Sequence, residues 1–227
     1  PYHIGLDSAL PYYHVCIGLQ DDNSWCAPSS GLSGIGVLNR DWYQVAPGDG
    51  MWSVFDPKDP NFVWSTSTNS GTGQVYLTNL KTREQYEVSP DAENNGENAA
   101  SALRYRFNWD TPLAFTHDGK ALAGGNVVFE SADHGTTWSA ISPDLTRNDP
   151  AHQAAPGGPI SLDESGAEHY NTILDIETSK IAGGPIWVST DDGLVQMTSD
   201  EGAHWNNATP KGLPEGRIPT CLLYTSD

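Results

Sequence analysis

Acidic side chains stand beside aromatic ones at several points of the chain, and together they could carry out sugar chemistry. Two carboxylates about 5–10 Å apart can act as general acid and base on a glycosidic bond, and aromatic rings offer a large apolar face. The candidates for such a catalytic pair are Asp49, Asp110, Asp191 and Asp192. The candidates for holding a substrate are Asp21, Asp22, Trp52, Trp109, Glu168, His169 and Tyr170.

A plainer interpretation exists for each of these acids. The segments Asp-Asp-Asn at 21–23 and Asp-Asp-Gly at 191–193 are also ordinary turn sequences, because Asp side chains bond their own backbone and Gly accepts a positive φ. Tryptophan in β proteins is commonly a core residue. The position of these residues in the fold therefore carries more information than any one of them.

The fold is indicated by a repeated eight-residue pattern, Ser/Thr-x-Asp-x-Gly-x-x-Trp. Each copy follows a β run, so the Asp is expected to accept backbone N–H groups of a hairpin turn. The Gly supplies a positive φ, and the Trp packs against the neighbouring sheet. We assign a structural role to both copies, which comprise Ser131, Asp133, Gly135 and Trp138, and Thr198, Asp200, Gly202 and Trp205.

Four four-stranded units can be laid out around this pattern, with Trp42 and Tyr86 in the aromatic position of the first two. Short apolar, β-branched and aromatic runs alternate with turn residues, and no helical period of any length is present. This favours an all-β fold, a β-propeller of four-stranded antiparallel blades at about 1–47, 48–92, 104–147 and 168–210. The expected strands are 2–9, 12–19, 24–29 and 41–47; 51–57, 62–67, 74–79 and 85–90; 112–118, 121–126, 127–132 and 137–143; and 173–179, 186–190, 194–199 and 204–210.

The strand register predicts which side chains share one end of the fold. In a four-stranded meander, the turns between strands 1 and 2 and between strands 3 and 4 lie at one end. The loops between strands 2 and 3 and the connections between blades lie at the other. The repeated Asp residues belong to the first end. The candidate catalytic and substrate-binding residues all belong to the second, so we expect them to gather there.

The chain resembles a group of exported bacterial proteins described as glycosyl-hydrolase-like, with bacterial neuraminidase (Asp-box) repeats, or as sortilin-type propellers. The resemblance covers about residues 1–218 and includes the segments 18–25, 104–109, 141–146 and 187–193. It implies a single propeller segment within 1–220 that belongs to a larger propeller. The further blades would come from the rest of a parent chain or from another copy. The tail 221–227 departs from the pattern and has the character of translated adapter sequence, an artefact.

The net charge and composition of the chain limit the classes of partner that it is expected to bind. With 29 acidic against 11 basic residues the formal charge is -18, which argues against nucleic acid or an anionic membrane surface. No apolar run approaches the ~20 residues of a membrane span, so we expect no membrane insertion. The spacing of Cys16 and Cys26 around a turn is compatible with a cross-strand disulfide, and two buried free thiols are the alternative. We expect no metal and no cofactor.

Two functions from different classes follow. The first is an extracytoplasmic protein, periplasmic or secreted, directed at a glycan and acting as a glycoside hydrolase through paired carboxylates. The second is a sortilin-like module that binds a peptide or protein without catalysis, or a structural propeller of the cell surface. A close carboxylate pair with a raised pKa favours the enzyme, whereas dispersed carboxylates favour the binding module.

Overall fold

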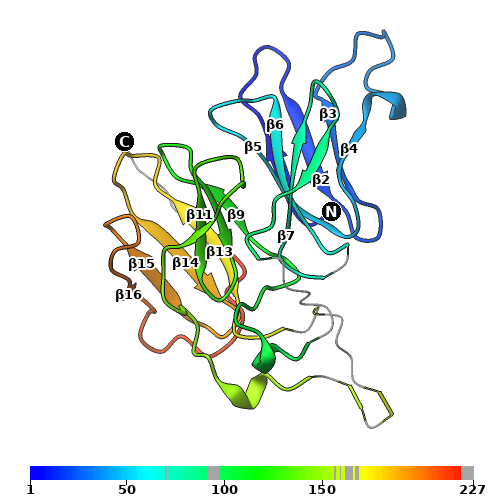
Figure 1. The fold of residues 1–227 in the computed structure, drawn as a ribbon. Helices are drawn as coiled ribbons and strands as arrows, with labels where there is room; N and C mark the ends of the chain where they lie inside the picture. Colours follow the sequence, from blue (N-terminus) through cyan, green and yellow to red (C-terminus); the bar gives the residue numbers. More distant parts are fainter. Residues whose placement is uncertain are drawn as a thin grey trace.

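The chain folds into β-sheets joined by turns and loops (Figure 1). The computed structural model describes residues 1–69, 71–91, 98–155, 157–158, 160–161, 166 and 169–220. Helical structure in these ranges consists of the 3-10 turns η1 (Asn39–Asp41), η3 (Ala100–Ala102) and η4 (Pro150–His152). None of the helices described is long and apolar enough to cross a membrane. The expected tail 221–227, with Cys221, lies outside the described residues.

Four antiparallel sheets each contain four consecutive strands in simple meander order. The first sheet comprises β1 (Ile4–Leu6), β2 (His14–Gly18), β3 (Ser24–Pro28) and β4 (Tyr43–Ala46), and the second β5 (Gly50–Phe55), β6 (Phe62–Ser67), β7 (Gln74–Asn79) and β8 (Gln85–Glu87). The third comprises β9 (Leu113–Phe115), β10 (Ala121–Gly124), β11 (Val128–Ser131) and β12 (Ser139–Ala140), and the fourth β13 (Ile173–Thr178), β14 (Ile186–Thr190), β15 (Val195–Thr198) and β16 (Asn206–Asn207). The predicted all-β class is confirmed, and only β5 extends outside its expected range, by one residue.

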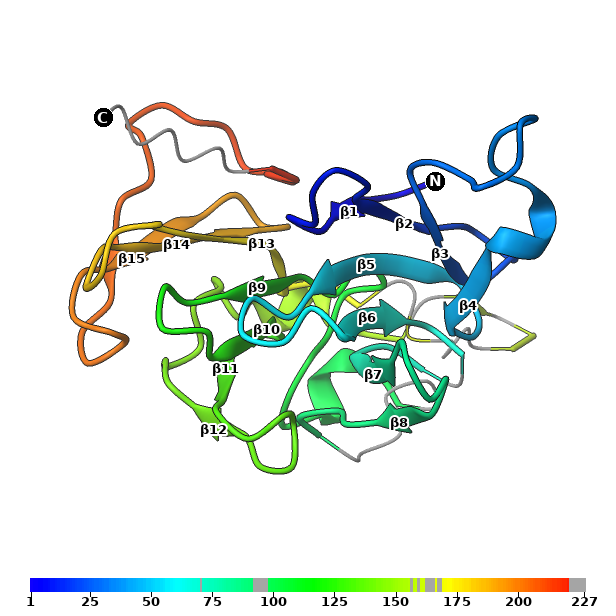
Figure 2. The same cartoon turned by 90° about the horizontal axis from the view of Figure 1, so that it is seen from above.

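The sheets pack face to face in chain order, around their first strands. Strands β1, β5, β9 and β13 contact one another in succession, and Figure 2 shows them toward the middle of the molecule, with β4, β8 and β12 outside. The core is accordingly divided into clusters between neighbouring sheets. Representative residues are Val45 and Val63 between the first and second sheets, Trp64 and Leu113 between the second and third, and Leu122 and Val188 between the third and fourth.

The first sheet carries a disulfide between Cys16 of β2 and Cys26 of β3. The two residues stand directly opposite each other in the strand register, with Cα atoms 4.1 Å apart. Both are fully buried in the cluster between the first and second sheets. The cross-link therefore fixes the register of the first hairpin within the core.

The two copies of the repeated pattern, residues 131–138 and 198–205, form what we call the regular turns. In the first, Asp133 accepts the backbone N–H of Thr137 at 2.9 Å, and in the second Asp200 accepts that of His204 at 2.9 Å. The glycines have φ of 75° and 92°. The indole of Trp138 donates to the carbonyl of Val88 in the preceding sheet, as predicted for a residue that joins neighbouring sheets.

Candidate functional site

A pocket of about 450 Å³ lies where all four sheets meet. Its lining residues precede or open the first strand of each sheet, or follow β14 or β16. The lining residues are Tyr2, Met51, Asn108, Trp109, Asp110, His169, Tyr170, Asp191 and Arg217. Five of the residues proposed from the sequence are therefore brought together here: Trp109, Asp110, His169, Tyr170 and Asp191.

Asp191, in the turn after β14, is the buried carboxylate of the pocket, with 2% of its surface exposed. Its oxygens accept the backbone N–H of Thr172 at 2.9 Å and the hydroxyl of Thr172 at 2.6 Å. Burial raises the pKa of Asp191 to about 6, and the charge of Asp192 adds to this effect, against the hydrogen bonds from Thr172. A carboxyl group with this pKa is partly protonated near neutral pH and can donate a proton.

Asp110 supplies the second carboxylate of the pocket from the segment that leads into β9. One oxygen, Oδ2, lies 2.8 Å from Nε2 of His3, and the backbone N–H of Asp110 donates to Asn108 at 3.0 Å. The other oxygen, Oδ1, is buried and accepts no hydrogen bond from any described residue. His3 in turn stacks on Trp52, with ring centroids 3.9 Å apart. Trp52 therefore supports Asp110 through His3 and is not part of the pocket wall.

Three further predicted acids lie outside the pocket wall. Asp49 accepts the backbone N–H of Asp21 at 2.6 Å, which joins the first sheet to the connection that follows it. Burial raises the pKa of Tyr2, and the charges of Asp49, Asp110 and Asp21 raise it further. These carboxylates thus lie close enough to Tyr2 for their negative charges to raise the pKa of its hydroxyl. Asp22 has an exposed side chain, and its carbonyl accepts the Trp25 indole N–H at 2.5 Å.

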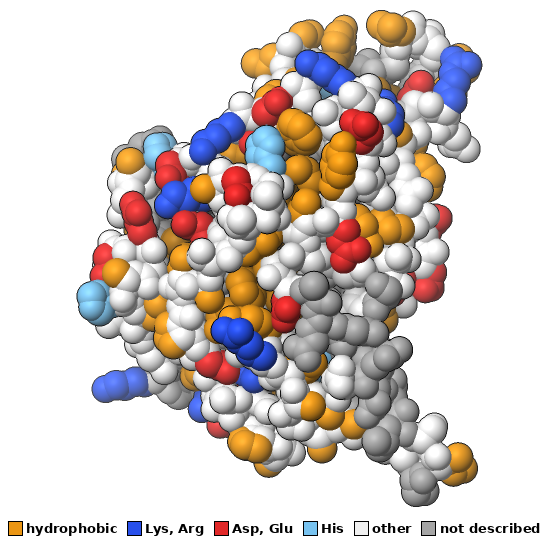
Figure 3. All heavy atoms as spheres, viewed as in Figure 1, with side chains coloured by type: hydrophobic (Ala, Val, Ile, Leu, Met, Phe, Trp, Pro, Cys, Tyr) orange, Lys and Arg blue, Asp and Glu red, His pale blue; other side chains and the backbone are white. Residues whose placement is uncertain are grey.

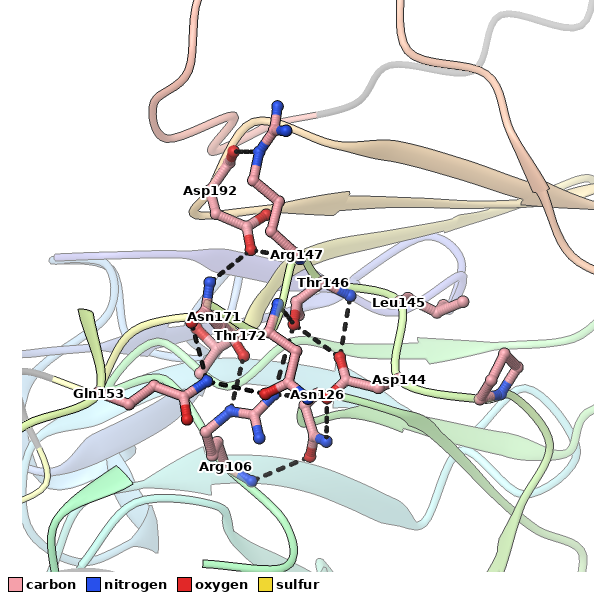
Figure 4. Close-up of polar contacts among 12 residues, drawn as sticks. Arg106, Asn126, Asp144, Leu145, Thr146, Arg147, Gln153, Asn171, Thr172 and Asp192 are labelled. Carbon is pink, nitrogen blue, oxygen red and sulfur yellow. Dashed lines mark hydrogen bonds and ion pairs between the residues drawn. The ribbon is translucent and has the colours of Figure 1, made fainter. Parts of the chain in front are cut away.

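Asp192 is buried but does not line the pocket, although it is adjacent to Asp191 in the chain. Its carboxylate accepts the backbone N–H of Arg147 and the side-chain amide of Asn171, each at 2.7 Å, and the Thr190 hydroxyl at 2.5 Å (Figure 4). The Arg147 side chain also donates to the carbonyl of Asp192 at 2.8 Å. The structure therefore gives Asp192 a place in a polar network between the third and fourth sheets, away from the pocket.

The same network contains an ion pair between the buried Arg106 and the partly exposed Asp144 (Figure 4). Burial alone would raise the pKa of Asp144, but hydrogen bonds from Thr146, Asn126 and Arg106 outweigh it and lower the pKa. Arg106 also donates to the carbonyl of Asn171 at 3.2 Å. Asn171 directly precedes Thr172, so this network holds in place the residue whose backbone N–H and side-chain hydroxyl both donate to Asp191.

The segment before β13 supplies the remaining predicted residues. Burial lowers the pKa of His169, against hydrogen bonds to the backbone of Asn98 and Phe107, and so favours the neutral imidazole. Burial raises the pKa of Tyr170, and the charges of Asp191 and Asp192 add to it. Glu168, proposed as a substrate-binding residue, lies outside the described residues.

Sequence reasoning missed several residues of this site, namely Tyr2, His3, Met51, Asn108 and Arg217. Two of them could have been identified from their position in the sequence. Tyr2 and His3 open the first strand of the first unit, the same position that singled out Asp110 and Tyr170 in later units. Arg217 lies beyond the last recognised strand and had no such signal.

No set of three or more His, Cys, Asp or Glu side chains suitable for a metal occurs in the part of the chain that the structure describes. No protein-family model matches the sequence, and no curated protein matches it significantly. The site must therefore be interpreted from its own geometry and chemistry.

Proposed function

We propose that the chain is a segment of an Asp-box β-propeller whose central pocket binds a carbohydrate and hydrolyses a glycosidic bond. The support for a propeller is the succession of four meander sheets whose first strands adjoin, with apolar cores between neighbouring sheets. The regular turns recur at the same place in the third and fourth sheets. Further blades would complete the ring, from the rest of a longer chain or from a second copy.

One observation carries the catalytic part of the proposal: Asp110 and Asp191 line one pocket, and the pKa of Asp191 is raised to about 6. Protonated Asp191 is the general acid, which gives its proton to the glycosidic oxygen as the bond breaks. Asp110, whose Oδ1 is not engaged by any described residue, is the second carboxylate, acting as nucleophile or as base toward water. Two carboxyl groups in unlike environments are the usual basis for such a division of roles.

The other pocket residues suit a sugar. The rings of Trp109 and Tyr170 provide apolar surface for the C–H face of a pyranose. Asn108 donates to the Thr172 hydroxyl at 3.0 Å, and its position beside the pocket continues the polar chain that ends at Asp191. Arg217 supplies a permanent positive charge next to Asp191.

The second candidate is a sortilin-like propeller that binds a peptide without catalysis. It is favoured by the finding that Asp49 and Asp192, half of the predicted catalytic set, are engaged in hydrogen bonds outside the pocket wall. In that case Arg217 would be an anchor for a peptide carboxylate, and Asp191 would have no chemical role.

An extracytoplasmic location is part of the same proposal. The disulfide between Cys16 and Cys26 supports it, because such cross-links persist mainly in oxidising compartments. The acidic composition, with a charge of -18, is consistent with an exported protein that does not bind nucleic acid.

The test is a glycan-array screen of the purified chain, followed by hydrolysis assays on every glycan that binds. We expect binding, and we expect Asp191→Asn and Asp110→Asn to reduce hydrolysis at least about 100-fold. Glu201→Gln, which removes an exposed acid in the second regular turn, is the matched control and should leave hydrolysis unchanged. Binding of peptides but of no glycan by a folded sample would favour the second candidate.

A further inference from the structure

A second cavity, of about 720 Å³, lies between the first and second sheets. Its lining comes from His14 at the start of β2, Pro28 at the end of β3, the β3–β4 loop, β4, and the β5–β6 and β7–β8 turns. These connections belong to the end of the sheets opposite the central pocket. We call this cavity the distal groove, and its chemistry differs from that of the pocket.

The β7–β8 turn that borders the groove is shorter than the regular turns. It has six residues, 79–84, between the paired residues Thr78 and Gln85, whereas each regular turn has eight residues between its last paired residues. Lys81 and Arg83 lie in this short turn, and Tyr86 lies beyond it in β8, opposite Leu77. The turn therefore places two cationic side chains at this end of the second sheet.

The β7–β8 turn also differs from the first regular turn in what it contacts. In the first regular turn a Cβ on Gly135 would lie 2.6 Å from the Cβ of Val88, so the turn packs tightly against the preceding sheet. At the β7–β8 turn, Arg83 instead has a φ of 65° and extends its guanidinium over the Tyr43 ring, 3.6 Å from the ring centre. A positive φ is unfavourable for a residue with a side chain. Tyr86, in β8, is 50% exposed and does not line the groove.

The groove is cationic on a strongly acidic protein. Arg40, Lys81 and Arg83 line it, and none of the three forms a salt bridge with a described carboxylate. Asp41, the acid in the lining, accepts the backbone N–H of Leu38 at 2.7 Å, and the charge of Lys81 acts on Asp59 nearby. Figure 3 shows Lys and Arg side chains near the upper edge of the molecule, above β3 and β4.

We propose that the distal groove binds an acidic saccharide, a short sugar chain that carries carboxylate or sulfate groups. Guanidinium groups pair with such anions through two parallel hydrogen bonds, and the ring of Trp42 in the lining offers an apolar face to the sugar. The volume lies in the range of small-ligand sites. An extended peptide usually pairs with the edge of a sheet, whereas turn and loop side chains form most of this lining. This site does not depend on the chemistry of the central pocket.

The test is calorimetric titration of the chain with trigalacturonic acid and, separately, with its fully methyl-esterified, neutral form. A sulfated trisaccharide forms a third arm that tells which anion is preferred. We expect the charged sugars to bind at least tenfold more tightly than the ester. Equal binding of acid and ester, or no binding of either charged sugar, would overturn the proposal. Tighter binding of a hexaglutamate peptide would reassign the groove to acidic peptides.

Substitutions in the lining test whether the acidic saccharide binds in the distal groove. The double variant Lys81→Asp/Arg83→Gly removes both cations of the β7–β8 turn and relieves the positive φ, so it should fold and yet lose at least tenfold in affinity. Arg40→Ala, from a different loop, should weaken binding as well. Lys180→Asp/Lys211→Gly makes the same change in net charge elsewhere and should stay within twofold of the parent. Asp191→Asn should also bind normally. An equal loss in the Lys180/Lys211 control would show a general charge effect and overturn the assignment.

Discussion

Asp191 and Asp200 lie in the turns at the two ends of β15, and their environments are opposite. Asp191 is buried, and burial raises its pKa to about 6. Asp200 lies at the surface of the second regular turn, where hydrogen bonds from the His204 side chain and backbone and from Thr198 lower its pKa to about 2. One short strand therefore separates a carboxyl group that retains its proton from one that loses it readily.

The difference shows how a repeated β fold can place structural carboxylates at one end of its strands and a proton-donating carboxyl group at the other. A carboxylate that accepts turn N–H groups stabilises the turn in its charged form and has no proton to give. A carboxyl group at the other end of the same strand, where four sheets meet, is removed from water by its neighbours. Asp133 repeats the first case: hydrogen bonds from Thr137 lower its pKa.

The largest expected effect is on the pH dependence of hydrolysis. If Asp191, with a pKa of about 6, is the general acid, kcat/KM should fall about 50-fold between pH 6, where half of the carboxyl groups are protonated, and pH 8. Initial rates measured across pH 4–9 on a glycan from the screen give this profile. Glu201→Gln should retain it. A profile that stays flat to pH 8 would remove Asp191 from the acid role.

The next largest effect is expected on the free energy of unfolding, through the turn that contains Asp200. Trp205 packs against the core between the third and fourth sheets and donates to the carbonyl of Ile141 at 3.0 Å. Trp205→Ala should lower the free energy of unfolding by about 2–3 kcal/mol. Tyr86→Ala, at an exposed position of β8, should cost less than about 1 kcal/mol. Urea unfolding of both variants measures the contrast, and equal losses would refute it.

A smaller effect should appear in the stability of Asp191→Asn. A carboxyl group whose folded-state pKa lies above its unfolded value destabilises the fold as pH rises from about 4 through 6. The variant should therefore be more stable than the parent at pH 8, by about 1–2 kcal/mol, and equal to it at pH 4. Urea unfolding at the two pH values measures this. A variant that is less stable at pH 8 would mean that its hydrogen bonds to Thr172 outweigh the cost of burying the charge.

The smallest effect is expected from Asp200→Asn. The lowered pKa of Asp200 means that its stabilisation is present above pH 4 and is lost as pH falls through about 2. The variant should melt a few degrees below the parent at pH 7 and at the same temperature near pH 2. Asp133→Asn, in the first regular turn, should behave in the same way. Thermal unfolding followed by circular dichroism gives both comparisons, and an unchanged melting temperature at pH 7 would count against the turn role.

The fold could be predicted from the sequence because the residues that indicate each strand and turn lie close together in the chain. The runs at 62–67, 74–79 and 186–190 are bounded by turn residues, and β6, β7 and β14 occupy those same ranges. The strand register also indicated that Asp110, Tyr170 and Asp191 share one end. Local patterns could not show that Asp192 bonds Arg147, 45 residues away, or that Asp110 meets His3, 107 residues away. Those contacts depend on how the sheets pack, which the pattern within each sheet does not specify.

The most direct test of this account is a carboxyl-carbon NMR titration of the folded protein from pH 1.5 to 8, with Asp191 and Asp200 assigned from their Asn variants. One experiment then reports both carboxyl groups under identical conditions. The account predicts a midpoint near 6 for Asp191 and near 2 for Asp200. Two midpoints near 4, the ordinary value for aspartate, would show that the two ends of β15 do not differ and would remove the basis for a general acid at Asp191.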